Sequence, residues 1–111
     1  MEKTARITGT TKLVGLIGSP VQHSGSPTIH NAVFEKLGLD CAYFAFDVDN
    51  VRLQDTVRGM VSMGFLGYNV TTPCKTFILP FLDEVSEAAE IMGAVNTVVI
   101  QLSLIHISEP T

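Results

Sequence analysis

The stretch Lys12–Gly38, KLVGLIGSPVQHSGSPTIHNAVFEKLG, decides the fold. It opens with an aliphatic run, Leu13–Ile17, that is typical of a buried strand. A loop rich in glycine, serine and proline follows. Ser26-Pro27 then predicts a helix start, because serine can cap free N–H groups and proline suits the first turn. Apolar residues recur at helical spacing as far as Leu37, and Gly38 is a good helix terminator. The stretch therefore predicts a strand, a loop and a helix.

The same alternation continues to residue 100. We expect further strands over residues 41–48, 65–70 and 94–100, which are rich in aromatic or β-branched side chains. Helices are expected over 51–63, from residue 73 onward and over 83–92, where Asp83 can cap the first turn. Alternating strands and helices predict an α/β fold with a largely parallel sheet and helices on both faces. Ligands of such folds bind beyond the carboxyl ends of the strands.

The composition limits the class of protein and its partners. A length of 111 residues fits one compact domain. With 46% hydrophobic residues and a mean hydropathy of +0.34, the chain is not disordered, and we expect apolar surface to be left exposed. A net charge of −4 argues against a nucleic-acid binder. No apolar run approaches the ~20 residues of a membrane span. The polar start, Met1–Lys12, lacks a signal-peptide core, so we expect a cytoplasmic protein.

The sequence gives no sign of a metal or nucleotide site. Cys41 and Cys74 have neither metal-site spacing nor the density of a disulfide scaffold, so reduced thiols are expected. Gly15–Gly18 matches neither the Gly-x-Gly-x-x-Gly pattern nor a Walker lysine motif. The three histidines form no ligand cluster of known spacing, so no metal is predicted (His23, His30 and His106). The oligomeric state leaves no mark in the sequence.

Two polar blocks follow predicted strands. His23-Ser24-Gly25-Ser26-Pro27 places two hydroxyls ahead of a helix N-terminus, where the free N–H groups and the helix dipole favour a carboxylate or phosphate. The alternative is that Ser26 only caps the helix and Ser24 belongs to a turn. In Asn69–Lys75, Lys75 falls in the first turn of a helix, where a cation is disfavoured. Such a lysine can take a proton from a substrate hydroxyl, whereas the alternative is an ordinary solvated lysine.

The third polar block is Gly93-Ala94-Val95-Asn96-Thr97, at the start of the last predicted strand. Its small residues and its amide suit close backbone approach and a polar contact to a ligand. The alternative is a helix end followed by a strand, with Asn96 satisfying a loop.

Together, the three blocks resemble the N-terminal substrate-binding domain of the shikimate dehydrogenase family, including its quinate/shikimate branch. That family reads His-Ser-x-Ser-Pro-x-x-His-Asn, then Asn-Val-Thr-x-Pro-x-Lys, then Gly-Ala-Val-Asn-Thr. The match runs in order over about Leu13 to Val99. It implies reversible, NADP-dependent reduction of 3-dehydroshikimate to shikimate, a step toward chorismate and the aromatic amino acids.

The resemblance also implies roles for five residues. Ser24 and Ser26 would bind the substrate carboxylate, which agrees with the anion site inferred above. Thr71 and Asn96 would hold ring hydroxyls. Lys75 would be the catalytic lysine that handles the proton. Buried polar groups matched to a polyol reject analogues that lack a hydroxyl, which gives such a site its selectivity.

The chain departs from the family after Val99. The family continues into Gly-x-Asn-Thr-Asp, whose aspartate partners the lysine, and then into a Rossmann domain that binds the cofactor. Here residues 101–111 resemble translated sequencing-adapter read-through instead, so we expect a truncated domain over 1–100 and a non-native tail. The isolated chain is then expected to lack dehydrogenase activity and to be marginally stable.

Two other functions stay open on the sequence alone. One is a non-catalytic module that binds small carboxylates such as shikimate or quinate. The other is a phosphate-ligand binder that uses the loop Gly18–Ser26, which the missing glycine pattern disfavours. The choices between shikimate and quinate and between NADP and NAD are also open.

Overall fold

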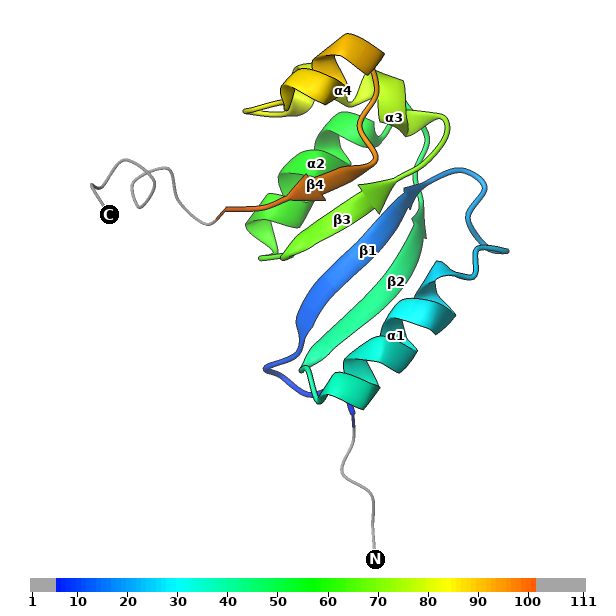
Figure 1. Ribbon diagram of the computed structural model, residues 1–111, viewed down its shortest axis with the longest axis vertical. Helices are drawn as coiled ribbons and strands as arrows, with labels where there is room; N and C mark the ends of the chain where they lie inside the picture. The colour runs from blue at the N-terminus through cyan, green and yellow to red at the C-terminus, as the bar shows by residue number, and fades with distance from the viewer. Residues whose placement is uncertain (1–5, 102–111) are drawn as a thin grey trace, which may run out of the picture.

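A four-stranded sheet with the order β2-β1-β3-β4 forms the centre of the molecule (Figure 1). The structure is a computed structural model that describes residues 6–101. Strand β1 (Lys12–Gly18) pairs in parallel with β2 (Cys41–Asp47) and with β3 (Gly67–Val70). Strand β4 (Thr97–Val99) pairs antiparallel with β3. The predicted α/β fold with a largely parallel sheet is confirmed.

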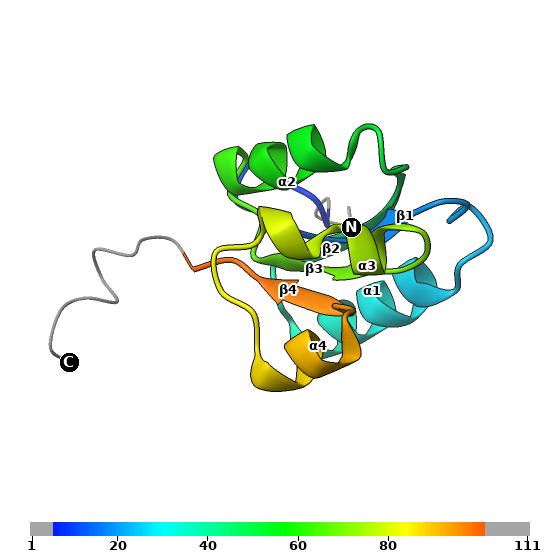
Figure 2. The same ribbon diagram turned by 90° about the horizontal axis from the view of Figure 1, so that it is seen from above.

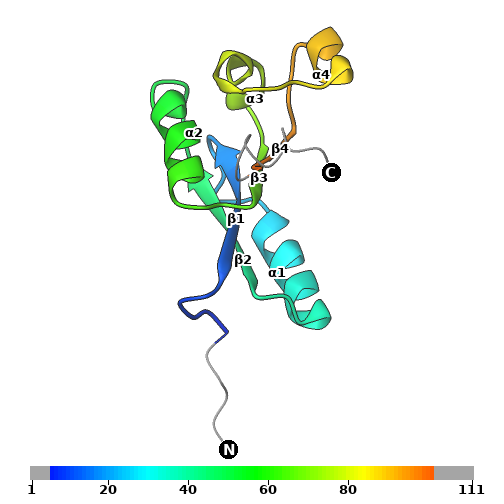
Figure 3. The same ribbon diagram turned by 90° about the vertical axis from the view of Figure 1, so that its left-hand side faces the viewer.

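Helices lie on both faces of the sheet, as predicted. Helix α1 (Ser26–Leu37) covers one face and α2 (Leu53–Ser62) the other (Figure 3). The short helices α3 (Cys74–Phe77) and α4 (Glu87–Met92) gather beyond the carboxyl end of β3 (Figures 1 and 2). A 3₁₀ turn, Leu79–Phe81, follows α3. None of the helices within residues 6–101 has the length and apolar character that a bilayer span requires.

Alternate side chains of the strands enter two apolar clusters, one on each face. The larger cluster lies on the α2 side and includes Ile17, Leu53 and Ile78, which are fully buried. The smaller cluster, on the α1 side, consists of Leu16, Val21 and Tyr43 with a few half-buried neighbours. Helix α1 contributes no fully buried residue to it. The α1 side is therefore the more thinly packed side of the sheet.

Side chains occupy the outer edge of β2. The even-numbered residues direct their N–H and carbonyl groups toward β1, since Lys12 N donates to the Asp40 carbonyl and Val48 N donates to the Gly18 carbonyl. The odd-numbered residues of β2 therefore direct these groups away from the sheet. Arg6 donates to the carbonyl of Cys41, and Arg52 donates to that of Asp47. Between these two, Asn31 bonds both the N–H and the carbonyl of Tyr43. The edge strand thus finds its hydrogen-bond partners in side chains rather than in another strand.

Two of the predicted helix caps are wrong. Ser26 is the first residue of α1 and Gly25 is its N-cap, without a side-chain bond. The hydroxyl of Ser24 instead accepts a hydrogen bond from Ser26 N at 3.1 Å.

The second wrong cap is Asp83, because α4 begins only at Glu87 and Ser86 caps it by accepting a bond from Ala89 N. The residues before Ser86 stay irregular, since Leu82 and Val85 pack their side chains against the larger cluster.

Candidate functional site

The five predicted site residues lie on three connections at one end of the sheet. Ser24 and Ser26 follow β1, Thr71 and Lys75 follow β3, and Asn96 directly precedes β4. Because β4 runs antiparallel to β3, the start of β4 lies beside the end of β3. Two backbone hydrogen bonds of 2.8 Å fix this arrangement: one runs from Val70 N to the Asn96 carbonyl, the other from Val95 N to the Lys75 carbonyl.

Backbone contacts also tie the loop after β1 to the loop after β3. Ser19 N donates to the carbonyl of Thr72, and Thr71 N donates to the carbonyl of Ile17, both at 2.9 Å. The loops can approach this closely because Gly18 has no side chain. A Cβ atom at Gly18 would lie 2.3 Å from Cγ2 of Thr71. The end of β1 therefore holds the backbone at both Thr71 and Thr72.

A chain of polar side chains crosses the sheet on the α1 side. The hydroxyl of Tyr43 donates to Oδ1 of Asn69 at 2.8 Å, and Nδ2 of Asn69 donates to Oγ1 of Thr97 at 2.9 Å. Burial raises the pKa of Tyr43, and the nearby Ser26 side chain opposes that rise in part. The polar chain thus connects β2 with β4.

Sequence analysis gave no role to Tyr43 or Thr97. Residues 43, 69 and 97 are far apart in the sequence, and only the strand register brings them together. In the sequence, these positions are marked only by the polar blocks: Asn69 is the first residue of the second block and Thr97 is the last residue of the third.

The predicted site residues keep polar groups that can serve a ligand. Ser24 uses an oxygen lone pair for Ser26 N, so its own proton is left to donate. Among residues 6–101, Thr71, Lys75 and Asn96 have no side-chain hydrogen bond. Asn96 is exposed and the other four are half-buried. The arrangement can hold an anion at the serines and a hydroxyl or carbonyl group at the lysine.

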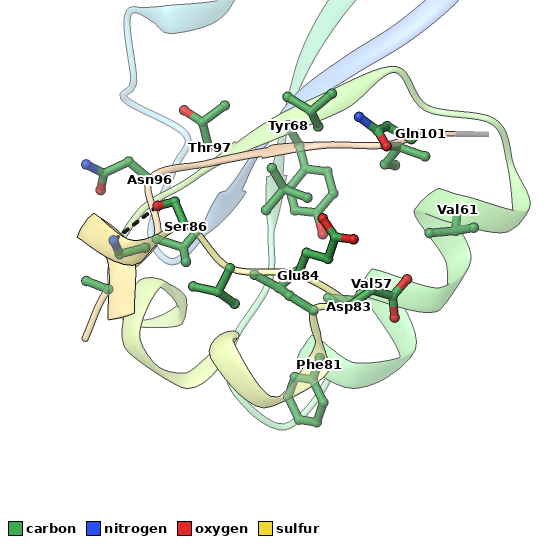
Figure 4. Close-up of a pocket in the computed structure, with 18 of the residues that line it drawn as sticks. Val57, Val61, Tyr68, Phe81, Asp83, Glu84, Ser86, Asn96, Thr97 and Gln101 are labelled. Carbon is green, nitrogen blue, oxygen red and sulfur yellow. Dashed lines mark hydrogen bonds between the residues drawn. The ribbon is translucent and has the colours of Figure 1, made fainter. Parts of the chain in front are cut away.

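A cavity of about 560 Å³ lies elsewhere, between β4, α4 and α2 (Figure 4). Of the five predicted residues, only Asn96 lines it. Tyr68 enters it from β3, and burial raises the pKa of Tyr68 to about 12. Tyr68 belongs to the apolar cluster on the α2 side, whereas Tyr43 belongs to the one on the α1 side. Of the polar chain, only Thr97 also lines the cavity, so the cavity and the chain meet at the start of β4.

The residues between 6 and 101 do not fit a metal or a dinucleotide. They contain no group of three His, Cys, Asp or Glu side chains that could hold an ion. Cys41 and Cys74 are free thiols, as predicted, and burial raises the pKa of Cys74. A pyrophosphate needs glycines whose open side faces the ligand. Here the ring of Phe46 closes the open side of Gly15, and the loop after β3 closes that of Gly18.

The family model described as the shikimate dehydrogenase substrate binding domain matches residues 16–98. The chain belongs to this family. All five predicted site residues of this shikimate dehydrogenase substrate-binding domain fall inside the matched range. The resemblance inferred from the three sequence blocks is confirmed.

Known relatives are similar over most of the chain but are much longer. The shikimate dehydrogenase (NADP(+)) of Listeria monocytogenes serotype 4b is 55% identical over 96 residues, which cover 86% of this chain and 33% of that protein. A crystal structure of shikimate 5-dehydrogenase from Listeria monocytogenes, in complex with shikimate and NAD, has 54% identity and a TM-score of 0.87. The match covers 89% of this chain and 34% of the chain in that crystal structure.

Quinate dehydrogenase from Corynebacterium glutamicum, in complex with NAD, has 38% identity and a TM-score of 0.75, and covers 83% of this chain and 34% of that one. The chain spans about a third of the length of these relatives.

Proposed function

We propose that this chain is the substrate-binding part of an NADP-dependent shikimate dehydrogenase. In that enzyme 3-dehydroshikimate is reversibly reduced to shikimate, on the way to chorismate and the aromatic amino acids. The observation that carries the proposal is the convergence of Ser24, Ser26, Thr71, Lys75 and Asn96 at one end of the sheet, within the range that the family model matches. A cytoplasmic location belongs to the same proposal, since free cysteines suit a reducing compartment.

In this proposal, Ser24 and Ser26 bind the substrate carboxylate. Ser24 has a proton to donate, and the positive end of the α1 dipole adds to the attraction. Thr71 and Asn96 lie on the neighbouring connections and take the ring hydroxyls.

Lys75 is proposed to move the proton. During reduction of the ketone its Nζ donates a proton to the substrate oxygen, and it takes the proton back in the reverse direction. The nicotinamide cofactor supplies or accepts the hydride when bound. We assign no cofactor-binding residue to this chain, because Gly15 and Gly18, the glycines at the end of β1, are closed off by their neighbours.

The proposed domain covers residues 1–100. The proposed non-native tail covers residues 101–111, of which residues 102–111 lie outside the described residues.

Ligand titration into the 111-residue chain tests the proposal. Shikimate is added to ¹⁵N-labelled protein, and the dissociation constant is read from chemical-shift changes. We expect weak binding that Ser24→Ala, Ser26→Ala and Lys75→Ala each reduce. Lys36→Ala removes a different lysine, in the last turn of α1, and is the matched control for loss of a cation. We expect it to leave binding unchanged. A parallel titration with quinate decides the open question of substrate preference.

Two outcomes separate the alternatives. Undiminished binding by Lys75→Ala favours a non-catalytic carboxylate-binding module over part of an active site. Oxidation of NADPH by the purified chain with 3-dehydroshikimate would contradict the expectation that this chain alone is inactive.

A further inference from the structure

We propose that His30 and Asn31 form a clamp that positions Tyr43 and helix α1, and through them Asn69 and Ser26, beside the proposed substrate site. The inference rests on the proposed function and adds two positioning residues to it. Neither residue is one of the proposed substrate ligands. They are neighbours in α1 and hold two different parts of one tyrosine.

Asn31 holds the backbone of Tyr43. Its Nδ2 donates to the Tyr43 carbonyl, and its Oδ1 accepts from Tyr43 N, both at 2.9 Å. Both groups point away from the sheet, where a further strand would otherwise bind them. The side-chain amide therefore takes the place of a neighbouring peptide group, because it offers one donor and one acceptor at the same spacing.

His30 holds the ring of Tyr43. The imidazole and the phenol are stacked, with ring centroids 4.3 Å apart and planes inclined by 8°. Stacked aromatic pairs at this separation stabilise one ring orientation. The side chain of Tyr43 is only 1% exposed, so its ring has little space in which to turn.

The clamp matters for the site because of what lies at the tip of the ring. The Tyr43 hydroxyl donates to Oδ1 of Asn69 at 2.8 Å. Its donation fixes which end of the Asn69 amide is the acceptor, and thereby directs Nδ2 toward Thr97. A movement of Tyr43 would therefore change the orientation of the Asn69 amide and its bond to Thr97.

The clamp also sets the position of α1 relative to the sheet. No residue of α1 is fully buried, so apolar packing fixes the helix only loosely. The paired hydrogen bonds from Asn31 are directional and allow one register only. Ser26 lies at the start of the same helix, so this register also places the proposed carboxylate ligand.

The test uses the ¹⁵N-labelled 111-residue chain with three readouts. These are the side-chain amide signals of Asn69, the dissociation constant for shikimate and the urea midpoint of unfolding. We expect Asn31→Ala to shift the Asn69 signals and to weaken shikimate binding about tenfold, the scale of lost hydrogen-bond pairing. The control Glu35→Ala, at an exposed position of the same helix, leaves all three readouts unchanged.

Conservative variants separate positioning from general stability. His30→Phe retains a ring that can stack, so we expect it to keep the Asn69 signals, whereas His30→Ala shifts them. In Asn31→Asp the carboxylate at pH 7 cannot donate to the Tyr43 carbonyl, but the neutral acid at low pH can. We therefore expect this variant to resemble Asn31→Ala at pH 7 and to recover wild-type Asn69 signals near pH 3, below the ordinary aspartate pKa of about 3.9. A purely structural role would not give this recovery.

Each result decides something. Unchanged Asn69 signals and affinity in Asn31→Ala, with or without a lower urea midpoint, would overturn the clamp. If Asn31→Ala does not fold, the Asn31→Asp series between about pH 3 and pH 7 decides instead. If the wild-type chain binds no shikimate, the proposed function of this chain fails, while the Asn69 signals still report on the clamp.

Discussion

Gly18 lies where the loop after β1 passes the loop after β3. An added Cβ would meet Cγ2 of Thr71 at 2.3 Å and the Thr72 carbonyl oxygen at 2.9 Å. The backbone φ of +156° is also one that residues with side chains rarely adopt. This residue therefore determines how close Thr71 can come to the end of β1.

The substitution Gly18→Ala is expected to lower the free energy of unfolding by about 3 kcal/mol, because the two loops must separate. Urea denaturation followed by circular dichroism measures the change. Gly9→Ala is the control, since a Cβ there meets no atom within 4 Å. Equal free energies of unfolding for the two variants would show that the loops can separate without loss of stability.

Asp40 connects the turn before β1 to the loop before β2. Its carboxylate accepts hydrogen bonds from the hydroxyls of Thr10 and Thr11. These bonds, the one from Thr10 first, hold the pKa of Asp40 below its usual value of 3.8. The folded state thus favours the ionised form of this group.

We expect Asp40→Asn to lower stability at neutral pH. A carboxyl whose pKa is depressed on folding stabilises the fold above its unfolded pKa, and that contribution is lost as the pH falls through the folded pKa. The stability difference between wild type and Asp40→Asn should therefore be present at pH 7 and smaller at pH 3, because it declines as the pH falls below 3.8. Urea midpoints at both pH values give the comparison, with Glu35→Gln as the control. A difference of equal size at both pH values would argue against this cause.

At the scale of elements, the sequence predicted each strand and helix but not all of their limits. Repeated apolar spacing and the terminator Gly38 gave α1 its full range, since both signals are local. Asp83 and Ser86 are both good capping residues, and only packing of the intervening side chains selects Ser86. The direction of β4 could not be predicted either, because it depends on pairing with a distant strand.

A substitution in helix α2 is expected to raise the free energy of unfolding rather than lower it. Gly59 lies within α2, and an added Cβ would find only Cε of Met63, at 3.9 Å. Gly59→Ala is expected to raise the free energy of unfolding by about 1 kcal/mol, because alanine loses less backbone entropy in a helix. Thermal unfolding measures it. Gly67→Ala in β3 is the contrasting variant, where the Cβ would lie 2.6 Å from the Val98 carbonyl oxygen and should destabilise.

At the scale of the whole molecule, large apolar side chains remain exposed, as the composition predicted. Ile29, Val33 and Leu37 form a stripe on α1 and are 64%, 46% and 65% exposed. Contiguous apolar surface of this kind favours association in water.

We therefore expect the purified chain to self-associate as its concentration rises. Val33→Lys should weaken this association, because it places a charge in the middle of the stripe. Gln54→Lys adds the same charge on α2 and serves as the control. Sedimentation velocity over a hundredfold range of concentration reports the outcome. A wild-type chain that stays monomeric throughout would show that the stripe does not drive association.

Some residues of the candidate site could be predicted from the local sequence, whereas others depend on contacts between distant segments. The serines before α1 and the lysine after β3 could be found from the sequence, since each belongs to a short block at a strand end. The roles of Tyr43 and Thr97 could not, because they depend on which strands are neighbours.

The occupied edge of β2 has a consequence for how sheets of this protein could grow. Arg6, Asn31 and Arg52 already bind three of the four outward carbonyls of β2, whereas β4 pairs only with β3 among the described residues. A strand could therefore be added at one side of the sheet only. Two copies joined through β4 would present a blocked β2 at each outer end. Edge-to-edge growth would stop at that pair, so a fibre could not form by further strand addition at β2.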